Sequence, residues 1–237
     1  MMELGIKPII LKVTMALFPD RQFASLLKFE LKLLAISIYS RLSPLEWLKV
    51  LSLRRSKDLM VNIGSGELRY QGWLNLDYCV SSSKNNLVCD LRRKWPLATG
   101  SVKYIFAEHV FEHFGYPEEI KHVLGECHRI LQPAGVLRVI VPDAERYLHA
   151  YTEDNETFLR QIGHGEKSKI SVINKMMREN GFHKYAYDYE KLKELLEETG
   201  FRVVILSSFK GSQYKELNLD LDELERKLVS LYVEAIR

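Results

Sequence analysis

Apolar side chains in the first quarter of the chain recur at the spacing of an amphipathic helix. Between residues 22 and 42 they return every three or four positions, with polar residues on the opposite side. This period predicts a helix over residues 22–42. Ser43 followed by Pro44 is typical of a helix start, with the serine as cap and the proline at the first helical position. A second helix is therefore expected over residues 44–53.

The pattern changes after residue 57, where short apolar runs begin to alternate with helix-like stretches. The runs that indicate strands cover residues 59–63, 73–76, 86–89, 102–107, 136–141, 202–207 and 228–236. The clearest helical periods between them cover residues 117–131 and 188–200. Strands that alternate with helices pair in parallel, because each connecting helix returns the chain to the same edge of the sheet. The sequence therefore predicts an α/β fold.

Charge divides the chain at the same point. Residues 1–57 hold ten Lys or Arg against four Asp or Glu, although the whole chain of 237 residues has a net charge of only +3. This length favours one large domain with an appendage over two equal domains. We expect a basic, amphipathic helical segment over residues 1–57 and one domain over residues 58–237.

Cysteine usage and hydropathy indicate the compartment. Cys79, Cys89 and Cys127 show neither CxxC spacing nor an even count, so we expect them to be reduced and mostly buried. Lys12 interrupts the N-terminal apolar stretch, which argues against a signal peptide. The longest uncharged run, near residues 33–40, is far below the ~18 residues that cross a bilayer. A cytoplasmic location is expected.

Candidate chemistry begins where the first predicted strand ends. Residues 61–66, VNIGSG, run from an apolar strand into a glycine turn, and glycines let the backbone bend sharply and approach a ligand. The next two predicted strands end in the acids Asp77 and Asp90, and the fourth ends in Glu108 and His109. Because parallel strands present their carboxyl ends at one edge of a sheet, we expect these groups to line one cleft. A plain tight turn also explains the two glycines alone.

As a set, these segments resemble the motifs of class I S-adenosylmethionine (SAM) dependent methyltransferases of the methyltransferase type 11 group. The segments that carry the resemblance are VNIGSG, GWLNLD, VCDLRRKWPLATGSVKYIFAEHVFEHF and ECHRILQPAGVLRVIVPD. Two later segments, GFHKYAYDYEKLKELLEETGF and LVSLYVEA, are similar to a compact subgroup of predicted SAM-dependent methyltransferases. The resemblance implies a Rossmann-like, seven-stranded, mainly parallel sheet with helices on both faces and the last strand antiparallel. It also implies S-adenosyl-L-methionine as the cofactor.

The resemblance assigns roles to individual residues. The cofactor-binding residues that it implies are Asn62, Gly64, Ser65, Gly66, Asp77, Asp90, Leu91 and Glu108. Among them, Asp77 is expected to hold the ribose hydroxyls, and Asp90 with Leu91 to flank adenine. Asn62 stands where many members of the family have an acid, so its contact with the SAM ammonium is expected to be weaker.

The connection between the first two predicted strands is unusually short. Only nine residues separate Ile63 from Trp73, whereas a parallel crossover normally needs about a dozen or more. The first helix of the fold is therefore expected to be very short or replaced by a tight loop.

Methyl transfer requires little chemistry from the protein. SAM already carries an activated methyl group, so the fold has to align an acceptor atom with it. For a hydroxyl acceptor a general base adds roughly 10²–10⁴ in rate. The candidate catalytic residues are His109, His113 and His183, because histidine titrates near neutral pH. Each has a structural hydrogen-bonding role as its alternative. His109 and His113 have metal-ligand spacing, but Glu108 and Glu112 do not follow the HExxH order, so no metal is expected.

Residues 143–182 differ from a standard crossover and are expected to form a substrate-covering insertion. Its aromatic and basic members are Tyr147, Tyr151, Phe158, His164, Lys167, Lys169 and Arg178. This mixture suits an anionic or sugar-like acceptor, although a solvated helical face explains the charges equally well. The expected function is SAM-dependent O- or N-methylation of a small-molecule or saccharide-like acceptor.

Other functions stay open at this point. The shortened crossover and Asn62 also fit a non-catalytic SAM-binding partner or a degenerate methyltransferase. Arg69 stands where a nicotinamide-dependent oxidoreductase needs its third glycine, which counts against that class. Nucleic-acid modification is disfavoured, because residues 108–111 read EHVF and not Asn or Asp-Pro-Pro-aromatic.

The basic N-terminal helices have two alternative roles. They could make peripheral contact with an anionic membrane through their Lys and Arg side chains. Alternatively, they could pack against the domain or mediate dimerisation.

Overall fold

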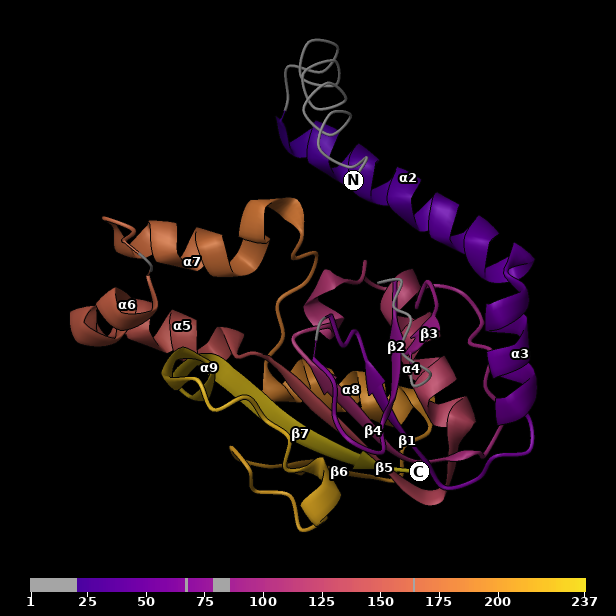
Figure 1. Ribbon diagram of the computed structural model, residues 1–237. Helices are drawn as coiled ribbons and strands as arrows, with labels where there is room; N and C mark the ends of the chain where they lie inside the picture. Colours follow the sequence, from indigo (N-terminus) through magenta and orange to yellow (C-terminus); the bar gives the residue numbers. More distant parts are fainter. Residues whose placement is uncertain (1–20, 67, 79–85, 164) are drawn as a thin grey trace.

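The computed structural model describes residues 21–66, 68–78, 86–163 and 165–237. Seven strands form a single sheet in the order β3-β2-β1-β4-β5-β7-β6, with helices around it (Figure 1). The strands are β1 (Leu59–Ile63), β2 (Leu74–Asp77), β3 (Asn86–Val88), β4 (Val102–Glu108), β5 (Leu131–Pro142), β6 (Val203–Leu206) and β7 (Ser230–Ile236). The α-helices are α2 (Arg21–Leu42), α3 (Pro44–Leu53), α4 (Glu118–Ile130), α5 (Ala144–Thr152), α6 (Glu156–Ile162), α7 (Lys169–Arg178), α8 (Tyr189–Thr199) and α9 (Leu224–Val229). Short 3₁₀ turns are η1 (Phe111–His113), η2 (Glu179–Gly181) and η3 (Lys215–Leu217).

The strand directions confirm the predicted fold class. Strands β1 to β5 pair in parallel, and β7 runs antiparallel to both β5 and β6. The order reverses at β1, where β2 continues on one side and β4 on the other. In an open α/β sheet, such a reversal leaves a crevice at the carboxyl ends of the strands, where ligands bind. The fold is therefore the Rossmann-like sheet with an antiparallel last strand.

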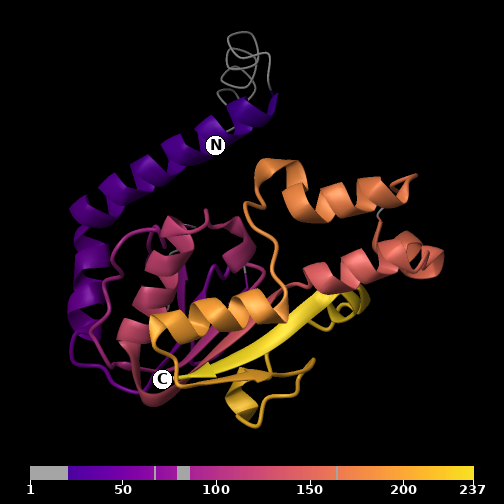
Figure 2. The same ribbon diagram turned by 180° about the vertical axis from the view of Figure 1, so that it is seen from behind.

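The two faces of the sheet bury separate cores because side chains alternate along each strand. On β5, Leu137 and Val139 pack with α4 and α8, which lie in front of the sheet in Figure 2. On the same strand, Val136 and Ile140 face the second core, which contains Leu217 of η3. The fully buried Arg138 pairs there with Asp220 and Glu234.

The connection between β1 and β2 forms without a helix, as its length predicts. Among its described residues, 64–66 and 68–73, all are turn or irregular structure. The backbone amide of Gly64 donates to Leu76 O at 2.8 Å, so the parallel pairing of β1 with β2 continues to the first residue of this connection.

The N-terminal helices pack along the rim at the carboxyl ends of the strands and along one edge of the sheet (Figure 1). α2 buries Ala24, Leu33 and Ile36, whereas several members of its predicted apolar stripe stay exposed. The exposed members include Phe23, Leu31, Leu34, Ile38 and Leu42. Most of the predicted apolar stripe therefore does not face the domain. The side of α2 that faces the domain contains the small Ala24 and the polar Ser37 beside Leu33 and Ile36.

Helix α3 covers the outer edge of the edge strand β3. Ser43 caps it as predicted, and its side chain accepts a hydrogen bond from Glu46 N. The buried Glu46 carboxylate accepts from Val88 N at 3.2 Å, and Lys49 Nζ donates to Asn86 O at 2.9 Å. These bonds satisfy backbone groups of a strand that has a neighbour on one side only.

Helices α5, α6 and α7 form a separate small cluster beside the sheet, at the left of Figure 1. They bury Tyr147, Leu159, Ile173 and Met176 among themselves and against Val229 of α9. This cluster occupies most of the residues predicted as a substrate-covering insertion.

Some residues named in the predictions lie outside the part of the chain that the structure describes. Cys89 and Cys127 are free and buried, as expected for reduced thiols, while Cys79 lies outside the described residues. The predicted absence of a signal peptide concerns residues 1–20, which also lie outside them, as does His164. Among the described helices, none combines the length and hydrophobicity needed to cross a membrane.

Candidate functional site

The glycine turn after β1 is fastened to the end of β2. Gly64 and Gly66 have φ values of +61° and +52°, in the left-handed region that favours glycine. A Cβ on Gly64 would meet Val110 Cγ2 at 2.4 Å, so a larger residue does not fit there. The amide of Gly66 donates to Asp77 Oδ2 at 2.8 Å, which fixes the buried carboxylate at the turn.

A first cavity of about 520 Å³ opens at this turn. Its lining residues from the strand ends include Gly64, Gly66, Asp77, Asp90, Leu91 and His109. With His113, which also lines this cavity, the structure brings together five of the predicted cofactor contacts and two of the predicted bases. Apolar side chains, among them Val110 and Phe114, complete this part of the wall. The cavity thus offers carboxylates beside an apolar slot, which suits a nucleoside.

Asp90 makes an ion pair with a neighbouring arginine at the rim of this cavity. Its Oδ1 accepts from Arg92 Nε at 3.1 Å, and its Oδ2 accepts from Arg92 Nη2 at the same distance. The guanidinium also pairs with Glu30 of α2 at 2.8 and 3.0 Å. One arginine therefore links the third strand end to the N-terminal helix.

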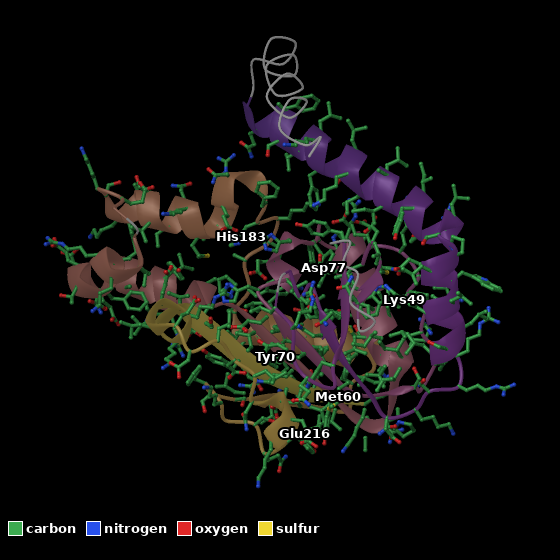
Figure 3. All side chains as sticks on the ribbon, viewed as in Figure 1. Lys49, Met60, Tyr70, Asp77, His183 and Glu216 are labelled. Atoms are coloured by element: carbon green, nitrogen blue, oxygen red, sulfur yellow. The ribbon has the colours of Figure 1, made fainter. Side chains whose placement is uncertain are left out.

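A second cavity of about 330 Å³ adjoins the first. Its lining residues include His109, Glu112 and His113 near η1, Tyr147 of α5, Val172 and Met176 of α7, His183, and Arg226 of α9. Both cavities are bordered by His109 and His113. Between them runs the segment 182–184, in which Phe182 and Lys184 line the first cavity and His183 the second. Figure 3 shows Asp77 and His183 at the same end of the sheet.

His109 is held in a strained position where β4 ends. Its φ of +52° is uncommon for a residue with a side chain. Its Nε2 lies 3.0 Å from the Ser230 hydroxyl and its Nδ1 lies 3.4 Å from Glu112 Oε1. Both ring nitrogens therefore face a polar group, and the ring borders both cavities.

His113 and His183 meet across the boundary. Their ring centroids are 5.0 Å apart. His113 Nδ1 lies 3.1 Å from Phe182 O, and His183 Nδ1 lies 2.5 Å from Met176 O. Because a carbonyl can only accept, each Nδ1 carries the hydrogen. In neutral His113 the Nε2 atom then keeps its lone pair, whereas His183 Nε2 faces a second acceptor, Glu179 Oε2, at 2.7 Å.

Glu112 is buried beneath these histidines. Within the described residues its carboxylate oxygens receive no hydrogen bond of normal length. Burial raises the pKa of Glu112, but the nearby His109 and His113 outweigh burial and lower it below the ordinary value of a glutamate. Glu112 is therefore a buried negative charge that faces imidazole nitrogens.

One protein family matches the part of the chain that contains the first cavity's strand ends. Residues 64–139, from the glycine turn into β5, match the family described as "Methyltransferase domain". Residues 64–139 are therefore a methyltransferase domain, and they lie on the Rossmann-like sheet described above. The matched residues contain every strand end of the first cavity except that of β1 itself, which stops at Ile63.

Solved structures of methyltransferases are similar to this chain at low sequence identity. A SAM-dependent methyltransferase from Archaeoglobus fulgidus is 16% identical, with 84% of this chain and 98% of that chain covered and a TM-score of 0.47. One from Mesorhizobium loti is 15% identical, with 82% and 99% covered and a TM-score of 0.47. The chain matches none of the curated proteins with which it was compared.

The residues of the methyltransferase domain fit SAM in the first cavity. A Cβ on Gly66 would meet no atom within 4 Å, so the turn leaves open space beside the Asp77 carboxylate. Cys89 also lines this cavity, and burial raises the pKa of its thiol to about 12, so it remains a neutral wall. A cradle of glycines, a buried acid and neutral walls are the features that a ribose and an adenine ring require.

Three of the predicted cofactor-binding residues do not line the first cavity. Asn62 Nδ2 donates to Asn75 Oδ1 at 3.3 Å, across the β1–β2 pair. The buried Ser65 hydroxyl accepts from Arg69 at 3.3 Å. Glu108 accepts from Leu221 N at 3.4 Å, and burial raises its pKa. These side chains have structural partners and do not belong to the described lining of the first cavity.

The sequence analysis missed the contribution of α2 to the site. Leu26, Phe29, Glu30 and Leu33 line the first cavity, and Phe29 makes edge-to-face contacts with Tyr78 and Phe182. These residues lie within a helix and not at the end of a predicted strand, so the strand-end rule that found the acids could not find them. The only usable signal was the amphipathic period of residues 22–42, which shows a helix but not what it covers.

Proposed function

We propose that this domain transfers a methyl group from SAM in the first cavity to an acceptor in the second. The observation that carries the proposal is that the two cavities adjoin and share His109 and His113. SAM supplies an activated methyl group when bound, so the protein has to hold the two partners in line at near-attack distance. Two adjoining cavities with a common border meet this requirement.

On this proposal the cofactor residues divide the ligand between them. Asp77 accepts hydrogen bonds from the ribose hydroxyls, while Gly64 and Gly66 leave space for the backbone to approach the ligand. Leu91 packs against adenine, and Asp90 stays beside it with Arg92. We do not assign a cofactor contact to the side chains of Asn62, Ser65 and Glu108, because each is hydrogen-bonded within the protein.

The second cavity suits a polar, small-molecule or saccharide-like acceptor. Arg226 and Lys175 can bind anionic groups, and Glu223 and Glu225 can accept hydrogen bonds from hydroxyls or amines. Tyr147 and Val172 add apolar surface of the kind that packs on a sugar ring. This mixture supports O- or N-methylation.

Among the three predicted bases, His109 is the one that we assign to the acceptor. It borders both cavities, and Glu112 and Ser230 fix the direction of its ring. A base at the shared border can take the acceptor proton as the methyl group arrives.

Two substitutions, one in each cavity, test the proposal. Val172→Trp should fill the second cavity and abolish methyl transfer, while the affinity for S-adenosylhomocysteine, measured by calorimetry, stays unchanged. Asp77→Ala should instead weaken S-adenosylhomocysteine binding. Turnover is measured as transfer of labelled methyl groups to a panel of hydroxylated and aminated small molecules. Tight cofactor binding with no turnover of any acceptor in the wild type would instead support the alternative, a non-catalytic SAM-binding partner or degenerate methyltransferase.

We also propose that the outer face of α2 and α3 makes peripheral contact with an anionic membrane. Leu31, Leu34 and Trp47 are more than half exposed, and Lys28 and Lys32 are exposed on the same segment. Apolar side chains flanked by basic ones are the composition that binds anionic lipid interfaces. Co-sedimentation with vesicles containing phosphatidylserine should occur at low salt and weaken at high salt. A protein that stays in solution in both, and elutes as a dimer, would favour dimerisation through these helices.

A further inference from the structure

A group of three side chains at the border of the second cavity has the composition of a metal site. One ligand atom from each of Glu112, His113 and His183 lies within 4.8 Å of the other two. Two imidazoles and one carboxylate form the ligand set of several catalytic zinc and iron sites, in which a further position stays open. The sequence did not reveal this group, because His183 lies 70 residues beyond His113.

The histidines are already oriented as metal ligands are. In metal sites, the ring nitrogen that does not bind the ion usually donates to a carbonyl or carboxylate, which fixes the tautomer. His113 Nδ1 donates to Phe182 O, and His183 Nδ1 donates to Met176 O. Neutral His113 therefore presents its Nε2 lone pair, which is the form that binds a cation. His183 Nε2 lies 2.7 Å from Glu179 Oε2, so it binds the ion after releasing the proton that it donates to this carboxylate.

The buried carboxylate is the independent observation. Glu112 is 1% exposed, and among the described residues its oxygens have no hydrogen bond of normal length. A buried carboxylate without such partners is unfavourable unless a positive charge compensates it. A divalent cation does so, and the second carboxylate oxygen can still face His109.

The backbone holds the three ligands in register. Lys184 N and Tyr185 N both donate to Glu112 O, at 2.8 and 3.3 Å. These bonds fasten the segment that carries His183 to the turn that carries Glu112 and His113. The ligands of one tetrahedral zinc ion lie about 3.3 Å apart, so the three side chains have to close by up to roughly 1.5 Å.

We propose that Glu112, His113 and His183 bind one divalent transition-metal ion of the zinc class. The open side of this site faces the second cavity, which also contains Glu179, whose Oε2 lies 2.7 Å from His183 Nε2. An ion there binds an oxygen or nitrogen of the acceptor and holds it beside His109. This last step rests on the proposed function, whereas the metal site itself does not. His113 and His183 then act as metal ligands and not as bases.

Zinc binding by the full-length, untagged protein tests the inference without any turnover. After treatment with a chelator and dialysis, the wild type should bind one Zn²⁺ per chain in equilibrium dialysis with elemental analysis. Glu112→Gln and His183→Ala should each lower the affinity at least ~10-fold. Zn²⁺ should also raise the melting temperature of the wild type but not of these variants, because the ion binds only the folded site.

The matched control is His149→Ala on α5. His149 is an exposed histidine between Glu145 and Glu153, at 3.7 and 3.6 Å, and it lies outside both cavities. This variant should bind Zn²⁺ as the wild type does. Wild-type protein that binds no stoichiometric Zn²⁺, full affinity in Glu112→Gln, or an equal loss in His149→Ala each overturns the inference.

Circular dichroism and S-adenosylhomocysteine affinity distinguish the loss of the metal site from the loss of the fold. Variants with native spectra and unchanged S-adenosylhomocysteine affinity have lost the ion and not the fold. A wild type that binds S-adenosylhomocysteine and methylates an acceptor equally well with and without Zn²⁺ overturns the role of the ion in holding the acceptor and leaves the proposed function intact.

Discussion

The first cavity has two walls of different origin. The strand-end wall contains Gly64, Gly66, Asp77, Asp90 and Leu91, and the helix wall contains Leu26, Phe29, Glu30 and Leu33 of α2. A backbone amide takes part in holding the first wall, where Gly66 N donates to the Asp77 carboxylate. Side-chain contacts hold the second, as in the ion pair of Glu30 with Arg92. The difference suggests that the strand-end wall supplies cofactor affinity and the helix wall supplies enclosure.

The largest expected loss of cofactor affinity follows from Gly64→Ala in the strand-end wall. Alanine at a φ of +61° costs about 1–2 kcal/mol, and its Cβ would displace Val110. We expect S-adenosylhomocysteine binding to fall about 100-fold, or ~3 kcal/mol, by calorimetry. Gly66→Ala is the control for backbone strain alone, because its Cβ meets open space. Equal affinities of the two variants would show that the clash with Val110 has no effect.

Asp77→Ala should have the next largest effect. It removes the carboxylate predicted to bind the ribose hydroxyls, together with the bond from Gly66 N. The expected loss of S-adenosylhomocysteine affinity is about 1–3 kcal/mol, measured by the same titration. Asp77→Asn keeps one acceptor oxygen and should lose less. An unchanged affinity in both variants would reject the placement of the cofactor.

A smaller effect is expected from Leu33→Ala in the helix wall. Leu33 is 4% exposed and lines the first cavity, whereas its neighbour Leu34 is 54% exposed on the outer side of α2. Loss of apolar contact should weaken S-adenosylhomocysteine binding by about 1 kcal/mol. Leu34→Ala, the matched control, should bind as the wild type does. If Leu33→Ala weakens binding more than Asp77→Ala, the assignment of affinity to the strand-end wall is wrong.

The smallest effect should come from Glu30→Gln. This change weakens the ion pair between Glu30 and Arg92. The Glu30 side chain in this pair is half exposed. Such pairs contribute about 0.2–1 kcal/mol, and the contribution should vanish near 1 M salt, where the Debye length is about 3 Å. Titrations at low and high salt give the measurement. A difference between variant and wild type that persists at high salt would mean that Glu30 contacts the ligand directly.

The strand-end wall could be predicted because it follows from local patterns. Apolar runs ending in Asp77 and Asp90 identify strands and the acids at their carboxyl ends, and parallel pairing brings those ends to one edge. The same rule placed Glu108 at the site, although the structure pairs it with the backbone near Leu221. A strand end gives the edge of the sheet but not which way a side chain turns there.

The helix wall and the second cavity could not be predicted, because they depend on contacts between distant segments. Phe29 meets Phe182, and His183 meets His113, across loops whose course no local period specifies. The helix predicted over residues 22–42 is confirmed as α2. Its exposed and buried sides, however, contain similar numbers of apolar residues, so the period does not show which side faces the domain. Docking of an amphipathic helix is decided by tertiary packing, and a single sequence does not reveal its partner.

The position of α3 has a consequence for the chain as a whole. Glu46 and Lys49 satisfy a backbone amide and a backbone carbonyl on the outer side of β3, the first strand of the sheet. Without them that side would present a bare row of peptide groups, which is a template for adding strands from other molecules. The N-terminal helices thus have two positions in the fold: α2 lines the first cavity, and α3 covers the sheet edge at which a strand of another molecule could add.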